Sequence, residues 1–115
     1  NTAESIFSIK LDKSDVTKSV KFISNISSGN TVNFQFQNDE LILGSSSHEK
    51  GSAIDKIKLD ETVNDLSVVY LASHVNKVLD ILPENIVEFD FLNYNGYTLL
   101  KLKADSYIHL IFPME

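Results

Sequence analysis

The sequence predicts an α+β fold in which two helices lie on one face of antiparallel β-sheet. Stretches of alternating apolar and polar residues, typical of half-buried strands, recur along the chain. Two other stretches carry apolar residues at intervals of three and four, which is the spacing of one helix face. The predicted order is a strand, a helix, three strands, a strand, a helix and three strands. Each half of the chain therefore has the order β-α-β-β-β, a repeat in architecture though not in sequence.

The first half is predicted to contain a strand at 5–12, a helix at 13–27, and strands at 31–37, 40–44 and 54–60. The apolar residues of the helix fall on one arc: Val16, Val20, Phe22, Ile23 and Ile26. Gly29-Asn30 is expected to stop this helix. Asn38-Asp39 is expected to turn the chain into a hairpin, and the polar segment 45–52 is expected to form an exposed edge or loop.

The second half is predicted to contain a strand at 66–71, a helix at 73–83, strands at 85–92 and 97–103, and a last strand at 106–115. The inward residues of the helix are Val75, Val78, Leu79 and Leu82, and Pro83 ends it. Asn95-Gly96 suits a tight hairpin turn. Chain ends usually carry polar residues, but this one finishes on an apolar strand and Pro-Met. The tail therefore either completes a core or is presented to a partner.

Length and composition favour a single domain spanning residues 1–115, with 43% hydrophobic and 23% charged residues. No apolar run approaches the roughly 18 residues of a membrane-spanning helix, so no membrane association is expected. Cysteine is absent, which excludes disulfides and thiolate metal sites and makes a reducing cytoplasm the default location.

The chain has ten lysines, no arginine and 16 acidic residues, giving a net charge of −6. This charge argues at first against nucleic acid. The two predicted helices, however, carry four lysines against two aspartates, while the rest carries six lysines against fourteen acids. The helix lysines fall on the polar faces: Lys13, Lys18, Lys21 and Lys77. Such a basic helical surface suits sequence-independent contact with DNA phosphates. The alternative interpretation is that these are ordinary solvated helix faces.

No pattern for catalysis or cofactor binding is found. His48, His74 and His109 are far apart and lack the spacing of metal ligands. The four glycines are isolated, so no phosphate-cradling loop is predicted. Glu88 and Asp90 alternate with apolar residues, which is typical of a solvated sheet face. We therefore expect no enzymatic activity, no metal and no cofactor.

Several stretches of this sequence, taken in order, resemble the C-terminal domain of the bacterial DNA polymerase III β subunit, the sliding clamp. They are E-L-I-L-G-S-S-S-H-E-K-G-S-A-I-D-K-I (40–57), Y-L-A-S-H-V-N-K-V-L-D-I-L (70–82), E-N-I-V-E-F-D-F (84–91) and Y-I-H-L-I-F-P-M-E (107–115). The resemblance covers residues from about 5 to 115 and rests on the ordered set rather than on a single motif.

The resemblance implies a DNA-clamp fold and a closed ring of six such domains, built from two three-domain subunits. Helices would line the hole and sheets would form the outside. The ring would slide on duplex DNA in the bacterial cytoplasm and tether the polymerase, without chemistry of its own. One domain alone cannot encircle DNA, and the isolated chain is expected to be monomeric.

The resemblance also implies an apolar pocket that accepts short linear peptides from polymerases, the clamp loader and repair proteins. The matching residues in this chain are His74, Leu110, Ile111, Phe112, Pro113 and Met114. The chain departs from the family at three positions beside this pocket. It has Leu71 where the family commonly has Asn, His74 where it has Tyr, and Glu115 where a basic residue is frequent.

Two alternatives remain open from the sequence. One is a clamp domain of the eukaryotic or archaeal type, which shares the topology; the serine-rich loop and the terminal Pro-Met favour the bacterial type. The other is a stand-alone α+β interaction module that does not bind DNA.

Overall fold

The computed structural model describes residues 3–26, 30–47, 51–104 and 107–113. Its elements are β1 (Glu4–Asp12), α1 (Lys13–Ile26), β2 (Thr31–Ser47), β3 (Gly51–Leu71), α2 (Ala72–Ile81), β4 (Ile86–Tyr94), β5 (Tyr97–Ala104) and β6 (Tyr107–Ile111). Every strand pairing among these elements is antiparallel. The predicted α+β class, with two helices and antiparallel sheet, is confirmed.

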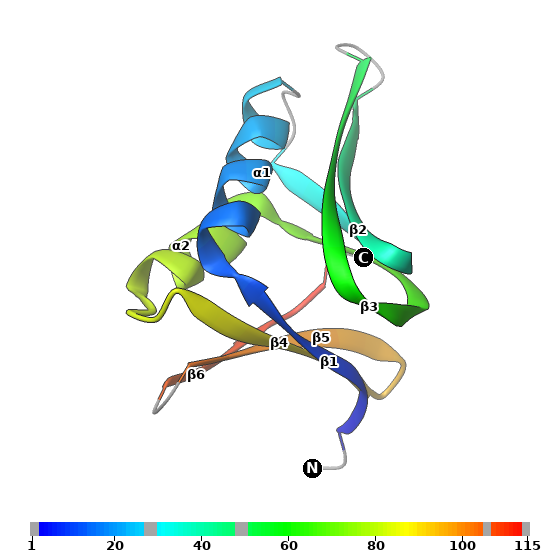
Figure 1. Ribbon diagram of the computed structural model, residues 1–115, viewed down its shortest axis with the longest axis vertical. Coiled ribbons are helices and arrows are strands. Elements are labelled where there is room, and N and C mark those ends of the chain that lie inside the picture. The colour runs from blue at the N-terminus through cyan, green and yellow to red at the C-terminus, as the bar shows by residue number, and fades with distance from the viewer. Residues whose placement is uncertain (1–2, 27–29, 48–50, 105–106, 114–115) are drawn as a thin grey trace.

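The strands form two sheets. One has four strands in the order β1-β4-β5-β6, and the other is a long two-stranded ribbon of β2 and β3. Figure 1 shows α1 and α2 side by side, with the ribbon on one side of them and the four-stranded sheet beneath. Both helices contact β2 and β3 as well as each other. The helices therefore form one layer, as the sequence predicted.

Among the side chains that the structure describes, the buried faces of the helices agree with the predicted periodicity, with one exception; the side chain of Ile26, predicted on the same arc, lies outside the described ones. The residues expected inside are all nearly inaccessible to solvent: Val16, Val20, Ile23, Val75, Leu79 and Leu82. Phe22, predicted on the same arc, is instead 47% exposed. At 100° per residue Phe22 lies well away from Val16, at the margin of the arc and one turn beyond Lys18. Its place next to the polar face of the helix accounts for this exposure.

The predicted hairpin at Asn38-Asp39 is wrong. Asn38 takes a φ of 56°, which asparagine tolerates better than most residues, but the chain bends there and continues as β2. Asn38 pairs with Val63 and Glu40 pairs with Lys58, so the intervening residues of β3 form a bulge. The predicted strands 31–37 and 40–44 are thus the two halves of β2, and 54–60 and 66–71 lie within β3.

The segment 45–52 was predicted as an exposed edge or loop, and this too is corrected for the part that the structure describes. Ser45 is buried and pairs with Ala53, and Ser47 pairs with Gly51. These residues extend the ribbon, because the backbone pairing continues regardless of the polar side chains. Residues 48–50 lie outside the described residues. As continuous strands, the order is β-α-β-β followed by α-β-β-β, rather than two copies of β-α-β-β-β.

The hairpin predicted at Asn95-Gly96 is confirmed. Both residues have positive φ, 53° and 86°, as a two-residue turn that matches the strand twist requires. Tyr94 and Tyr97 form the closing pair of β4 and β5.

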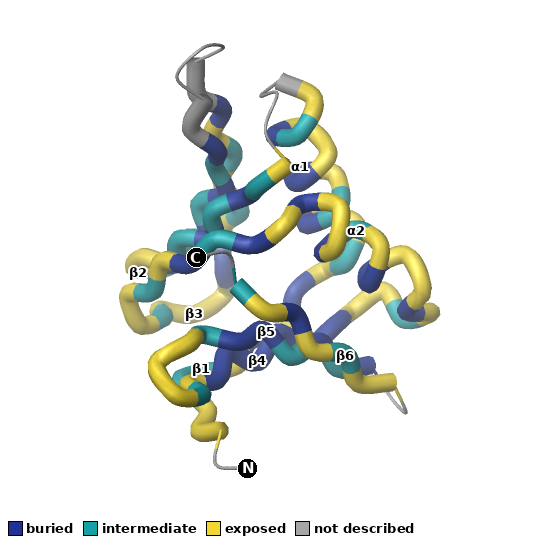
Figure 2. The backbone as a smooth tube through the Cα atoms, turned by 180° about the vertical axis from the view of Figure 1, so that it is seen from behind, coloured by how far each residue is buried: buried dark blue, intermediate teal, exposed yellow. Residues whose placement is uncertain are grey.

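A cluster of three phenylalanine rings joins the two sheets. The ring centroid of Phe7 on β1 lies 4.9 Å from that of Phe36 on β2, at an interplanar angle of 84°. Phe36 in turn lies 5.1 Å from Phe91 on β4. Edge-to-face pairs of this kind add about 0.5–1.5 kcal/mol each beyond the burial of their area. Figure 2 shows that the buried residues gather where the helices and the two sheets meet.

Tyr70 makes a second link between the sheets. Its ring is fully buried, and its hydroxyl donates a hydrogen bond of 3.0 Å to the carbonyl oxygen of Thr98 on β5. Burial raises the pKa of Tyr70 above its ordinary value, so the phenol remains a neutral donor. A single polar group therefore ties β3 to β5 within an apolar region.

Candidate functional site

The two helices form an antiparallel pair, because the start of α1 meets the end of α2. Asp12, the last residue of β1, begins α1: its Oδ1 accepts hydrogen bonds from the backbone N–H groups of Ser14 and Asp15, at 2.8 and 3.3 Å. This is the usual function of an aspartate at the N-cap position. The chain therefore enters α1 directly from β1 without a connecting loop.

The start of α2 depends on a residue from the other end of α1. Leu71 is the N-cap residue and supplies no side-chain hydrogen bond. Asn30 supplies the acceptors that an N-cap residue usually provides. Its carbonyl oxygen accepts a hydrogen bond from the N–H of Ala72 at 2.9 Å, and its Oδ1 accepts one from the N–H of Ser73 at 3.1 Å. The Asn30 amide also donates to Ser73 Oγ at 3.0 Å. These bonds hold the amino end of α2 next to the chain that leaves α1.

Lys13 links the helices at the opposite end. Its backbone N–H donates to the carbonyl oxygen of Asn85 at 2.7 Å, and its ammonium donates to the carbonyl oxygen of Leu82 at 2.5 Å. Leu82 is the C-cap residue of α2, where a positive charge interacts favourably with the helix dipole. Lys13 is accordingly only partly exposed, and its charge is already engaged within the domain.

The other three predicted DNA-facing lysines lie in solvent. Lys18 and Lys21 are exposed on α1, on the same face as Ser14 and Asn25, and Lys77 is exposed on α2. Because the helices lie side by side in one layer, their polar faces form one continuous side of the molecule. Lys18, Lys21 and Lys77 thus lie on the helix layer without an ion pair among the described residues, while the ammonium of Lys13 supports the helix pair instead.

The predicted pocket residues of the tail divide between core and surface. Ile111 is fully buried, whereas Leu110 and Phe112 are 48% and 62% exposed. Pro113 is half-buried, and Met114 lies outside the described residues. Ile111 therefore completes the core, while Leu110 and Phe112 leave apolar surface exposed to solvent.

His74 lies near the tail, because the helix that carries it contacts the strand that leads into the tail. Its side chain is exposed in the first turn of α2, and α2 contacts β6. Strand β6 is the last strand of the four-stranded sheet, so its outer edge has no partner within the part of the chain that the structure describes. An exposed helix end and a free strand edge are thus neighbours here.

No group of three or more His, Cys, Asp or Glu residues in the described ranges is arranged to hold a metal ion. His48 lies outside those ranges. None of the helices described has the length and apolar character needed to cross a bilayer.

Sequence reasoning missed Asp12 and the helix-linking role of Asn30. The signal for Asp12 was present, because an aspartate directly before a helical pattern is a common N-cap. The role of Asn30 depends on a contact between residues 43 positions apart, which no local pattern predicts. The one signal in the sequence was that Leu71, directly before α2, cannot cap a helix with its side chain.

Comparison with known proteins gives a family. The family model for the DNA polymerase III beta subunit, C-terminal domain, matches residues 3–115. No curated protein sequence matches this chain.

Solved structures of bacterial clamps share the fold. DNA polymerase III beta subunit from Thermotoga maritima has a TM-score of 0.83 at 17% identity, covering 100% of this chain and 32% of that chain. Pol III beta from Caulobacter crescentus has a TM-score of 0.81 at 17% identity, covering 94% and 29%. The Helicobacter pylori beta clamp, in complex with 3,4-difluorobenzamide, has a TM-score of 0.80 at 17% identity, covering 100% and 32%. The present chain therefore spans about a third of the length of these proteins.

Replacing Asn30 with alanine tests the contact that holds α2. Asn30→Ala removes the side-chain hydrogen bonds to Ser73, and we expect the free energy of unfolding to fall by about 1–2 kcal/mol, the usual cost of losing an N-cap. Urea denaturation measures this change. The control is Asn25→Ala, an exposed position on α1 where an effect within about 0.5 kcal/mol is expected. Equal stability of the two variants would show that Asn30 does not anchor the helix.

Proposed function

This chain belongs to the family of the DNA polymerase III beta subunit, C-terminal domain, and from that premise we propose that it forms part of a DNA sliding clamp. The complete clamp encircles duplex DNA and tethers the replicative polymerase for processive synthesis, acting in the bacterial cytoplasm as a non-catalytic subunit. The family match argues against a clamp domain of the eukaryotic or archaeal type. It also argues against a stand-alone interaction module that does not bind DNA.

The observation that carries the DNA-binding proposal is the position of the free lysines. Lys18, Lys21 and Lys77 are exposed on the single layer of helices, whereas the rest of the chain is strongly acidic. The acidic remainder repels phosphate, so DNA is favoured on the helix side. Lysine is a mobile point charge that contacts the backbone without distinguishing bases. This chemistry suits a protein that must slide along any sequence.

The free strand edges support a ring. Strand β6 ends the four-stranded sheet, and its surface carries exposed apolar residues, with Tyr107 at 48% and Ile108 at 59%. Exposed apolar edge strands are a liability in a lone domain because they template pairing with other chains. We propose that a neighbouring domain covers this edge in a homodimeric ring in which this chain is one of three domains per subunit.

The tail is proposed as part of a peptide-binding pocket. Leu110, Phe112 and Pro113 offer apolar surface beside the helix that carries His74; Ile111 supports them from the core, and Met114 would add an adaptable side chain. Short linear segments of polymerases, the clamp loader and repair proteins would bind here through one or two apolar anchors, which usually supply most of the affinity of a small interface.

Charge reversal on the helices tests the DNA contact. In the full-length ring, Lys18→Glu with Lys21→Glu should shorten the retention of the ring on linear duplex DNA at 50 mM salt. The dependence of log retention on log salt should fall by about 4, because the proposed homodimer holds two copies of this domain and loses four phosphate contacts. Retention is measured by gel filtration of loaded DNA at several salt concentrations.

The matched control reverses two lysines of the four-stranded sheet, Lys10→Glu with Lys103→Glu, which changes the net charge equally. Retention by this control should stay close to that of the parent protein. If both pairs reduce retention equally, general charge repulsion explains the loss and the helix face is not the DNA-binding surface.

Truncation tests the tail. The 115-residue chain should bind a short synthetic clamp-binding peptide weakly, with a Kd of about 0.1–1 mM, because a neighbouring domain would complete the pocket; each tenfold in Kd is about 1.4 kcal/mol. Removing residues 113–115 should abolish this binding while the fold persists, since Ile111 remains in the core. Backbone NMR shifts report both results. Tyr107→Ala, at the far end of β6, is the control that should bind normally. Unchanged binding after truncation would remove the tail from the pocket.

A further inference from the structure

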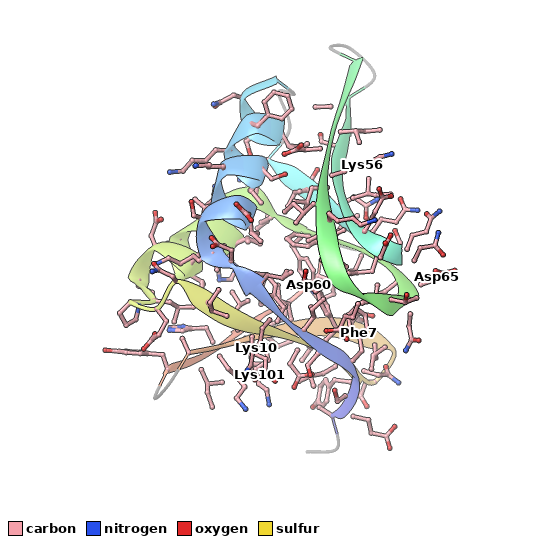
Figure 3. The ribbon with its side chains drawn as sticks, in the orientation of Figure 1. Phe7, Lys10, Lys56, Asp60, Asp65 and Lys101 are labelled. Carbon is pink, nitrogen blue, oxygen red and sulfur yellow. The ribbon has the colours of Figure 1, made fainter. Side chains whose placement is uncertain are left out.

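A cleft of about 680 Å³ opens between β1 and β3, apart from the helix lysines and the tail. One wall is Ser8 to Asp12 of β1 and the other is Ile57 to Glu61 of β3. Asp15 of α1 and two residues of β4 complete the lining. Figure 3 shows Asp60 between the ribbons of β1 and β3, and Lys10 projecting from β1. The function proposed above does not use this cleft.

The wall formed by β1 is a free strand edge. In the order β1-β4-β5-β6, β1 pairs only with β4 on one side, so its other edge has no strand partner among the described residues. In an antiparallel pair every second residue points its N–H and C=O away from the partner strand. The edge from Ser8 to Asp12 therefore offers backbone hydrogen-bonding groups to the cleft. Such an edge accepts an extended peptide as an added strand.

The charges of the lining favour a cationic ligand. The cleft is lined by five carboxylates and two lysines: Asp12, Asp15, Asp60, Glu61, Glu88, Lys10 and Lys58. Lys58 is engaged elsewhere, because its ammonium lies 2.6 Å from Asp39 Oδ2, outside the lining. Hydrogen bonding to Lys58 holds the pKa of Asp39 below its ordinary value. Lys10 is thus the lining lysine left to balance the five carboxylates.

The distribution of these carboxylates selects an extended ligand over a single ion. They come from β1, α1, β3 and β4, and within the described residues no three acids or histidines are arranged to hold a metal. Five residues of β1 span about 17 Å at roughly 3.3 Å per residue, and alternate side chains of an added strand repeat about every 7 Å. An added strand with several cationic side chains therefore matches the distribution of the carboxylates along the cleft. Ile86, 53% exposed at the rim, can cover the alkyl stem of such a side chain.

We propose that this cleft binds an extended, lysine- or arginine-rich segment of a partner protein. The segment adds as a strand to the free edge of β1 and places its cationic side chains among the carboxylates of β1, α1, β3 and β4. This interaction surface is separate from the tail pocket and from the helix face, and it does not require the ring.

Peptide titration of the 115-residue chain, followed by backbone NMR, tests the proposal. The probe is a capped octapeptide in which lysine alternates with threonine or valine. Shifts are expected at residues 8–12 and 57–61, with a Kd that rises at least fivefold between 50 and 300 mM salt. The control peptide has the same sequence with alternate backbone amides N-methylated, which keeps the charge but prevents strand addition. Its binding should be at least tenfold weaker.

Matched variants locate the charges. Asp60→Lys should weaken binding at least fivefold, whereas Asp65→Lys, an equal charge change on β3 outside this cleft, should alter it less than twofold (Figure 3). Lys10→Glu should tighten binding, a gain that misfolding cannot produce. The proposal is overturned if the two aspartate variants behave alike, if the methylated peptide binds equally well, or if the shifts fall elsewhere.

Discussion

A helix leaves its first N–H and last C=O groups without partners inside the helix, and α2 obtains those partners from residues beside α1. Asn30 supplies acceptors to Ala72 and Ser73 at one end, and Lys13 donates to Leu82 at the other. With only ten residues, α2 is too short to be stable alone in water. Its position in the layer therefore depends on these two contacts and on the buried stripe of valine and leucine beneath it.

That constraint organises the surfaces on which the proposed function depends. Antiparallel helices fixed at both ends present their polar faces on one side. Lys18, Lys21 and Lys77 therefore share a surface, although 59 positions of sequence separate the first from the last. The sheets carry the acidic residues and the free edges of β1 and β6. DNA would thus meet the helix layer, whereas a neighbouring domain and a tail-binding peptide would both meet the region of β6.

The sequence was most informative where a residue type has one dominant physical role. Apolar periodicity placed Val16, Val20, Ile23, Val75 and Leu79 in the core, and Asn95-Gly96 marked a turn that needs positive φ. Asn38-Asp39 has nearly the same composition as a hairpin turn, yet β2 continues through it and the extra residues of β3 opposite form a bulge.

Contacts between distant parts of the chain could not be predicted from the sequence. On a helical wheel at 100° per residue, Lys13 lies about 20° from Val20, at the edge of the apolar arc, whereas Lys21 lies about 100° from Val20. The contact of Lys13 with a C-cap carbonyl of the other helix is nevertheless visible only in the structure. The cleft between β1 and β3 requires the packing of two sheets that no local pattern defines.

The central claim is that the helix layer of this domain faces DNA and the outer face of its four-stranded sheet does not. The most direct measurement is site-specific photo-crosslinking in the full-length ring loaded on circular duplex DNA. A benzoylphenylalanine at position 21 should cross-link to DNA, and one at position 10 should give no DNA adduct. Equal cross-linking from both positions, or cross-linking from position 10 alone, would contradict the account.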